Sequence, residues 1–455
     1  MNRHPRPRLV LRALTGAIGA ALLWPAPPAE AARTPSYAIT KARVVTVSGA
    51  VMENATVVLR DGVVVDVGPS VTIPKDARVI DGTGLTLTPG LIDAYSGAGM
   101  PAPRPAGGGG AGAGAAAATP TPNPIAPASH IYERVRAVDA LKARDSGITT
   151  IVPIPREGLV FGAAAVMNLV GDRPEGMVVK PDIALAASLT TLGQRYPGSL
   201  MGTMAFFRQA LIDGAYHRAE RTAYEKAPSG RKRPAFDPGL DVWADVASGA
   251  TPLLLQTPRI GDLRRAFSLA DEFSLKLVLA GNTHAFEEAA LLKERKPALL
   301  VSVNVDPPKT GGFFGGSDDD KDRAEIESAE KNPGALHKEG IRFALVSGFA
   351  TDFLAGIRKA IEKGLPKDAA LRAVTLTPAE ILGVADRMGS IEKGKIANVV
   401  VWSGEPLTKE AKVKMVFVDG ELYEPEEKPA GPPGGGPPRP GEMNEGVREQ
   451  VEVKR

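Results

Sequence analysis

The chain contains no cysteine. Disulfide bonds, cysteine nucleophiles, thiolate metal sites and Cys-ligated iron-sulfur clusters are therefore excluded, and the hydrophobic core must stabilise the fold alone. Aromatic residues are also scarce, at 5% of 455 residues, whereas Gly (50) and Pro (40) are abundant. The remaining composition, 43% hydrophobic and 24% charged, is typical of a globular protein with one large domain or two medium ones.

A genuine excess of basic residues is also missing. The formal net charge is +3, but the first 31 residues hold four arginines (Arg3, Arg6, Arg8 and Arg12) against one acid, Glu30. Without that segment the basic and acidic side chains balance. A chain of this kind lacks the electrostatic attraction on which nucleic-acid affinity depends, so we expect no nucleic-acid partner.

No apolar run is long enough to span a membrane comfortably. Residues 1–31 combine a basic stretch, an apolar stretch at 13–24 and the small-x-small site Ala29-Glu30-Ala31, which is typical of a secretory signal peptide. The alternative is a membrane anchor, but the apolar stretch is short and is broken by Gly16 and Gly19. We expect removal of residues 1–31 on export to the periplasm or the extracellular space, with no transmembrane segment in the mature protein.

Short β segments are predicted near both ends of the chain, at 37–47, 55–60, 63–67, 77–80, 397–402 and 412–418. Asp61-Gly62 and Asp419-Gly420 are typical hairpin turns. Between these ends, eight apolar runs alternate with helical patterns, at 91–94, 148–154, 163–170, 183–187, 252–255, 275–280, 298–303 and 343–346. Apolar runs buried on both faces and separated by helices predict a parallel sheet closed into a barrel.

Two segments have compositions that cannot bury enough apolar surface to order themselves. Residues 101–128 are almost entirely Pro, Gly, Ala and Thr, and residues 424–440 are rich in Pro and Gly. We predict that residues 101–128 form a long loop after the first barrel strand. Residues 424–455 are predicted to be a disordered tail.

Two sequence blocks some 280 residues apart resemble the amidohydrolase superfamily, in particular its imidazolonepropionase-like branch. The first is Val79-Ile80-Asp81-Gly82-Thr83-Gly84 followed by Thr88-Pro89-Gly90-Leu91-Ile92-Asp93-Ala94. The second runs from Thr377-Pro378-Ala379-Glu380, which has the pattern of a helix capping box, to Gly389-Ser390-Ile391-Glu392-Lys393-Gly394-Lys395-Ile396-Ala397-Asn398, where the family usually has Asp at the last position. The resemblance implies an α/β fold: a (β/α)8 TIM-like barrel over residues 91–385, beside a composite β-sandwich formed by residues 37–90 and 386–423.

The resemblance also implies a metal centre, in which histidines and a carboxylate at the strand ends hold one or two divalent ions that activate a water. In this chain the two ligand positions after the first strand are Tyr95 and Gly97. The positions after the fifth, sixth and eighth strands are Gln256, Gly281 and Gly348. We therefore expect no binuclear metal site and no cofactor. A divalent metal such as zinc would bind only if the site has migrated.

Three residues remain as candidate site residues. His284 and Asp352 follow the sixth and eighth strands by three or four residues, and the alternative for His284 is a structural role at a helix start. Asp93 belongs to the family motif, but its place before the ligand positions fits a hydrogen-bonding strand-end residue equally well. The other histidines of the mature chain are expected at the solvated surface: His130, His217 and His337.

Two classes of function stay open. The first is an exported hydrolase of non-peptide carbon-nitrogen bonds, such as those of cyclic amides, with an altered or missing metal site. The second is a catalytically inactive barrel that serves as an exported binding or scaffold protein, because a fold alone does not carry a function. Both imply a small-molecule substrate or ligand at the barrel mouth, and neither determines the oligomeric state.

Overall fold

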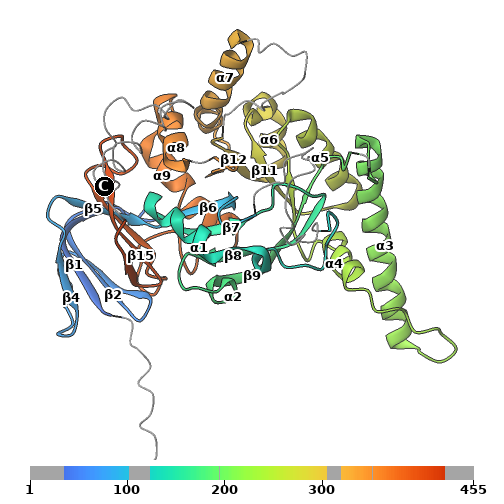
Figure 1. Cartoon of the computed structure of the whole chain (residues 1–455), viewed down its shortest axis with the longest axis horizontal. Coiled ribbons are helices and arrows are strands. Elements are labelled where there is room, and N and C mark those ends of the chain that lie inside the picture. Colours follow the sequence, from blue (N-terminus) through green and yellow to red (C-terminus); the bar gives the residue numbers. More distant parts are fainter. Residues whose placement is uncertain (1–34, 102–122, 194, 305–318, 351, 426–455) are drawn as a thin grey trace, which may run out of the picture. The chain divides into compact units, whose positions relative to one another are not determined.

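The computed structural model describes residues 35–101, 123–193, 195–304, 319–350 and 352–425, which form two eight-stranded sheets and the helices around them (Figure 1). The predicted signal peptide, most of the 101–128 loop and nearly all of the tail lie outside the described residues. Within the described part of the chain, no helix has the length and apolar character needed to cross a bilayer.

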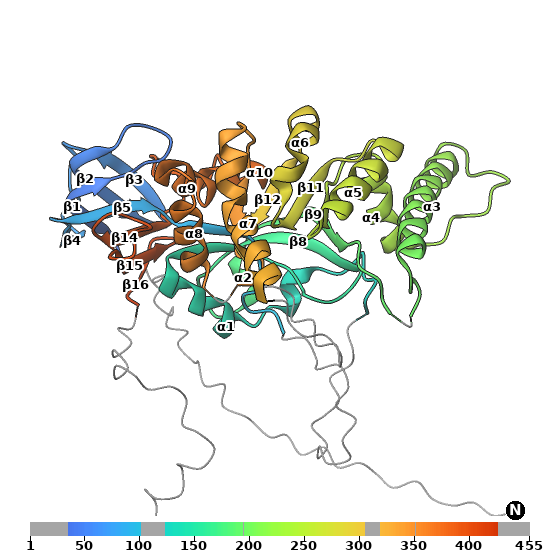
Figure 2. The same ribbon diagram turned by 90° about the horizontal axis from the view of Figure 1, so that it is seen from above.

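Strands from both ends of the chain form one composite sheet, in which blue and red strands lie side by side (Figure 2). Strand β14 pairs antiparallel with β5 from Val399 opposite Pro89 to Ser403 opposite Leu85. The N-terminal and C-terminal β segments are thus joined in one sheet, as the sequence predicted, and the C-terminal strands have no open edge on that side. The strands are β1 (Tyr37–Val44), β2 (Met52–Arg60), β3 (Val63–Gly68), β4 (Arg78–Asp81), β5 (Leu85–Pro89), β14 (Val399–Ser403), β15 (Lys412–Val418) and β16 (Glu421–Tyr423).

The second sheet is a nearly closed barrel in which all eight predicted apolar runs are strands, in sequence order. They are β6 (Leu91–Ser96), β7 (Ile148–Pro153), β8 (Val160–Asn168), β9 (Val178–Ser188), β10 (Leu253–Gln256), β11 (Leu277–Asn282), β12 (Ala298–Ser302) and β13 (Ala344–Val346).

The prediction of an all-parallel barrel is wrong at the third strand. Strand β8 pairs antiparallel with both β7 and β9, whereas the other neighbouring pairs are parallel. The connection between Pro153 and Val160 is too short to hold the crossover that a parallel pair requires, so the chain turns straight back.

Alternate residues of the barrel strands point to opposite faces. The interior holds mostly small and branched side chains, such as Ile92, Ala186 and Leu254, and the outward residues pack under the helices with Phe207 and Trp243. This separation places one filled core inside the barrel and another between the strands and the helices, so the barrel is a packed body rather than a pore.

Helices cover the outside of the barrel (Figure 1). The predicted capping box at Thr377 is wrong, because the helix begins at Leu376 and Glu380 instead pairs with Arg342 and Arg372. The helices are α1 (Ala137–Leu141), α2 (Pro174–Met177), α3 (Leu200–Lys226), α4 (Pro238–Ala247), α5 (Ile260–Phe273), α6 (Ala289–Arg295), α7 (Asp319–Lys338), α8 (Phe353–Glu362), α9 (Lys367–Ala373) and α10 (Leu376–Ile381).

The end of the predicted low-complexity loop is ordered against the barrel. Ile125 bridges to Val160, and the amide of Ala126 donates to the carbonyl oxygen of Val160 over 3.0 Å. Residues 123–128 therefore belong to the folded body, which corrects the boundary at Ala128. Hydrogen bonds to the backbone of β8 order this segment, although it has little apolar surface to bury.

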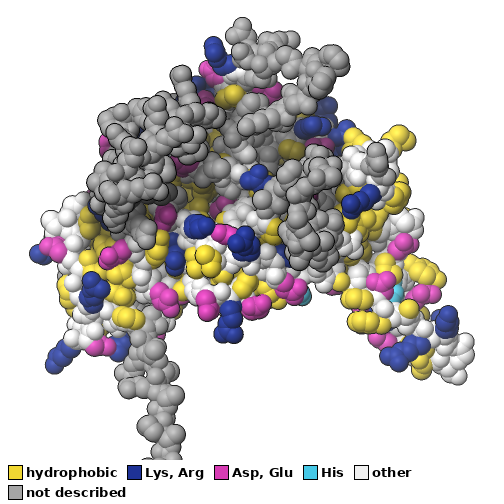
Figure 3. Space-filling view, viewed as in Figure 1, with side chains coloured by type: hydrophobic (Ala, Val, Ile, Leu, Met, Phe, Trp, Pro, Cys, Tyr) yellow, Lys and Arg dark blue, Asp and Glu magenta, His cyan; other side chains and the backbone are white. Residues whose placement is uncertain are grey.

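On the face shown in Figure 3, Lys and Arg side chains are interspersed with Asp and Glu side chains. Among the described residues on that face, no broad surface of one sign is visible. The mixture agrees with the balanced charge of residues 32–455.

Candidate functional site

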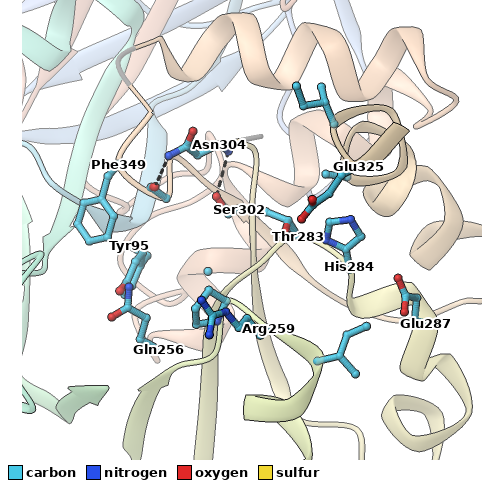
Figure 4. A pocket seen from close by; sticks show the side chains of 16 residues that line it. Tyr95, Gln256, Arg259, Thr283, His284, Glu287, Ser302, Asn304, Glu325 and Phe349 are labelled. Atoms are coloured by element: carbon cyan, nitrogen blue, oxygen red, sulfur yellow. Dashed lines mark hydrogen bonds between the residues drawn. The ribbon is translucent and has the colours of Figure 1, made fainter. Parts of the chain in front are cut away.

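A cavity of about 660 Å³ opens at the C-terminal ends of the barrel strands (Figure 4). The strand ends that line it carry Tyr95, Gln256, Gly281, Ser302 and Gly348, and His284 and Phe349 follow β11 and β13. Four of the five positions that the resemblance assigns to metal ligands thus line one cavity. In a barrel of this type, ligands bind at this end.

Tyr95 and Phe349 form one wall of this cavity. Their ring centroids are 5.1 Å apart in an edge-to-face arrangement, and Tyr95 is 1% exposed. Burial raises the pKa of the Tyr95 phenol well above its usual value, so the group stays protonated and is a poor metal ligand. Its hydroxyl has no hydrogen-bond partner among the described residues.

Phe349 is held in an unusual backbone conformation. Its φ is +71°, in the left-handed region that bulky side chains rarely adopt. The Arg156 guanidinium donates to the Phe349 carbonyl oxygen over 3.0 Å, and its carbon atom lies 4.9 Å from the centre of the Phe349 ring. The loop between β7 and β8 therefore fixes the aromatic ring at the mouth.

Side chains already fill the space of two missing ligands. A Cβ atom on Gly97 would lie 2.7 Å from Phe349 Cδ1, and one on Gly348 would lie 1.8 Å from Ser302 Oγ. Larger side chains such as His or Asp cannot enter these positions unless Phe349 and Ser302 move.

Asp93 lies beneath the cavity at the seam between the first and last strands. Its Oδ1 accepts hydrogen bonds from the amide of Ser347 (2.9 Å) and from the amide of Tyr95 (3.4 Å). Burial raises the pKa of this carboxyl group, against the hydrogen bonds that lower it. Asp93 thus links β6 to the residue after β13, where the strands themselves form no ladder.

Of the two displaced candidates, only His284 faces the cavity. His284 Nδ1 lies 3.0 Å from Thr283 Oγ1, and the Asn282 side chain accepts from the His284 amide. Asp352 is the N-cap of α8, where its Oδ1 accepts from the Ala355 amide over 2.9 Å. The structure therefore does not bring Asp352 to His284 at the cavity.

The prediction that His217 lies at the surface is wrong. It is 6% exposed and lies between α3 and α4, with Nε2 3.6 Å from Asp241 Oδ1. His130 is half-exposed beside Asp182, and His337 is exposed at the end of α7. None of these three lines the cavity.

Several polar residues of the cavity were not predicted from the sequence: Arg259, Glu287, Ser302, Asn304 and Glu325. Ser302 ends β12, so the rule that strand ends carry function could have identified it. Glu325 is on α7, and nothing in its local sequence relates it to the barrel mouth. Arg259, Glu287 and Glu325 are exposed and lie at the rim, whereas Tyr95 and Ser302 are buried at the floor.

The residues at the mouth do not fit the metal centre of the family. Two of its ligand positions are Gly97 and Gly348, and Phe349 and Ser302 fill the space that a side chain would need there. The other three are the protonated phenol of Tyr95, the amide of Gln256 and Gly281. Within the described ranges, no three His, Asp or Glu side chains converge as a metal site requires. The oxygen atoms of Tyr95 and Gln256 are neutral, and none of the five positions carries a carboxylate. Such a donor set is poor for zinc.

Comparisons with known proteins agree with the fold. A model of the amidohydrolase family matches residues 274–423. The curated "Amidohydrolase tasK" of Hapsidospora irregularis is 23% identical over 397 residues, which cover 77% of this chain and 38% of that protein. The chain thus spans well under half of that relative.

Solved structures show the same architecture. An amidohydrolase from Thermotoga maritima MSB8 superposes with a TM-score of 0.71 at 24% identity, covering 85% of this chain and all (100%) of that one. A Xaa-Pro dipeptidase with bound methionine has a TM-score of 0.53 at 18% identity, covering 86% of this chain and 100% of its own. Residues 274–423 thus match the amidohydrolase family in sequence, and the barrel is similar in fold to the amidohydrolase from Thermotoga maritima.

Proposed function

We propose that this chain hydrolyses a carbon-nitrogen bond other than a peptide bond, of the cyclic-amide type, in the cavity at the barrel mouth. The family supports hydrolysis, and the cavity has the size of a small-molecule site. The observation that carries the proposal is the position of His284, whose imidazole lines this cavity and is held by Thr283.

His284 would act as the general base. It would take a proton from a water molecule as the water oxygen bonds to the carbonyl carbon, and return a proton to the nitrogen as the carbon-nitrogen bond breaks. Thr283 Oγ1, 3.0 Å from Nδ1, orients the ring for this role. No step passes through a metal ion, because the residues at the family positions do not fit one.

Hydrolysis of hydantoin and dihydrouracil by the purified protein tests the proposal. We expect ring opening that withstands a chelator, with kcat about 10²-fold lower in His284→Gln. His337→Gln, an exposed histidine on α7, is the matched control and should keep full activity. Equal rates in the two variants would contradict the role of His284.

The same assay separates the hydrolase from a barrel that only binds. A protein that binds cyclic amides and never opens them would be the exported binding protein of the second hypothesis. Product formation above the uncatalysed rate would exclude that hypothesis.

We also propose that the protein is exported. The support is the basic, apolar and Ala29-Glu30-Ala31 pattern of residues 1–31, and the balanced charge of residues 32–455. N-terminal sequencing of protein recovered from the periplasm or the medium should begin near Ala32. Recovery of a chain that still carries residues 1–31 would contradict export by cleavage.

We further propose that the composite sheet folds into the two-layer sandwich of the imidazolonepropionase-like branch. Its support is β1, which pairs with β2 along one edge and with β4 and then β5 along the other. A strand that changes partners in this way can join two layers.

A further inference from the structure

The floor of the cavity carries a buried hydrogen-bond donor without a partner. The Tyr95 hydroxyl makes no hydrogen bond to any described residue, although the side chain is 1% exposed. An unpaired buried polar group destabilises the free protein. Such a group beside a cavity points to a ligand that completes it.

Gln256 is the neighbouring polar group. It ends β10, is half-buried and lines the same cavity, and its side-chain amide has no hydrogen bond to a described residue. In Figure 4 its amide end points towards Tyr95. Its NH2 group is therefore a second donor at the floor.

The depth of each group in the cavity indicates what kind of ligand fits. The floor groups Tyr95, Gln256 and Ser302 are neutral, whereas the charged side chains Arg259, Glu287 and Glu325 are exposed at the rim. Burial of an ion at a neutral floor would cost more than burial of a neutral dipole. The floor thus selects an uncharged acceptor.

We propose that the Tyr95 hydroxyl and the Gln256 amide bind the carbonyl oxygen of a neutral amide or urea at the floor of the barrel mouth. The inference rests on the proposed function only in that the same cavity holds the substrate. In the free protein the hydroxyl is buried, so neighbouring side chains must move as the ligand enters. In hydrolysis the two donors would stabilise the oxyanion that forms on this oxygen.

Binding of 2-pyrrolidinone and 2-imidazolidinone to the full chain, measured by ligand-observed NMR in the presence of a chelator, tests this inference. We expect Tyr95→Phe to weaken binding about 2- to 10-fold, the range of one hydrogen bond. Tyr37→Phe is the matched control, because Tyr37 is a buried tyrosine of the composite sheet, and it should leave binding unchanged. Lactam addition should also perturb the tyrosine absorbance of the wild-type protein, but not of Tyr95→Phe.

The outcomes distinguish this inference from the proposed function. Binding that depends on Tyr95 without any ring opening supports the inference and contradicts the hydrolase. Hydrolysis and binding that are unchanged in Tyr95→Phe contradict the inference and leave the hydrolase intact. If the wild-type protein binds neither probe, a neutral carbonyl is the wrong ligand class and the inference is overturned.

Discussion

The two ends of the barrel differ in whether their buried polar groups have hydrogen-bond partners. At the bottom, Thr150, Asn168, Asn398 and Asp419 form one network: Asn168 Nδ2 donates to Asp419 Oδ1 over 2.7 Å, and Asn398 Nδ2 donates to Asn168 Oδ1 over 3.1 Å. At the mouth, the Tyr95 hydroxyl has no partner among the described residues. A completed network stabilises the fold, whereas an incomplete one leaves donors for a ligand.

The network also explains a departure from the family sequence. Asn398 stands where the family usually has Asp, and its Nδ2 donates to both Thr150 Oγ1 and Asn168 Oδ1. A carboxylate at this position would face the Asn168 oxygen without a proton to share. Because burial also raises the pKa of nearby Asp419, a second carboxyl group would be unfavourable here.

The largest effect should come from breaking the bottom network. Asn168→Ala removes the 2.8 Å bond from Thr150 as well as the two bonds to Asp419 and Asn398, and leaves buried polar groups unpaired. We expect the free energy of unfolding to fall by about 3 kcal/mol in denaturant titrations. Gln209→Ala, an exposed position on α3 with one bond to Asp213, should change it by less than about 0.5 kcal/mol. Similar losses in both variants would refute the comparison.

The next effect concerns the mouth. The double variant Tyr95→His, Gly97→His restores the two imidazoles of the family, but the new Cβ at 97 would lie 2.7 Å from the Phe349 ring. We expect a loss of about 2 kcal/mol in unfolding free energy from overpacking, and no stoichiometric zinc by elemental analysis after dialysis. Adding Phe349→Ala should recover stability. Stoichiometric zinc in the double variant, with Phe349 intact, would show that the site can be rebuilt.

The sequence predicted the strands of the barrel better than their directions. The eight apolar runs predict the strands because burial on both faces selects continuous hydrophobic segments. The direction of β8 depends on the length of the connection before it, from Pro153 to Val160, which is a second signal that the apolar runs alone do not carry.

The sequence predicted only those site residues that lie at or shortly after strand ends. Tyr95, Gln256 and His284 are close in sequence to strand ends, so their meeting at one cavity follows from the fold. The packing of Phe349 against Gly97 and of Ser302 against Gly348 depends on loop conformations far apart in the chain, which no local pattern encodes. The cap at Asp352 has a local signal, since Asp before an apolar helix is a common N-cap.

A smaller effect should come from Asp93, at the seam between β6 and β13. Because burial raises the pKa of Asp93, the folded state holds its proton to higher pH than the unfolded state does, and stability falls as pH rises above the ordinary value of 3.8. Each unit of raised pKa corresponds to about 1.4 kcal/mol. Asp93→Asn should match the wild-type protein below that pH and gain on it towards neutral pH, in unfolding titrations at several pH values. A constant difference at all pH values would contradict the raised pKa.

The smallest effect should decide the role of Asp352. As the N-cap of α8, its carboxylate accepts from the Ala355 amide, so Asp352→Ala should lower the free energy of unfolding by about 1 kcal/mol. Asp352→Asn keeps the accepting oxygen and should be nearly neutral. Both variants should bind lactams and open cyclic amides at the wild-type rate, because Asp352 does not line the cavity. If Asp352→Asn keeps its stability but loses activity, the Asp352 carboxylate itself takes part in the chemistry, although it does not line the cavity in this structure.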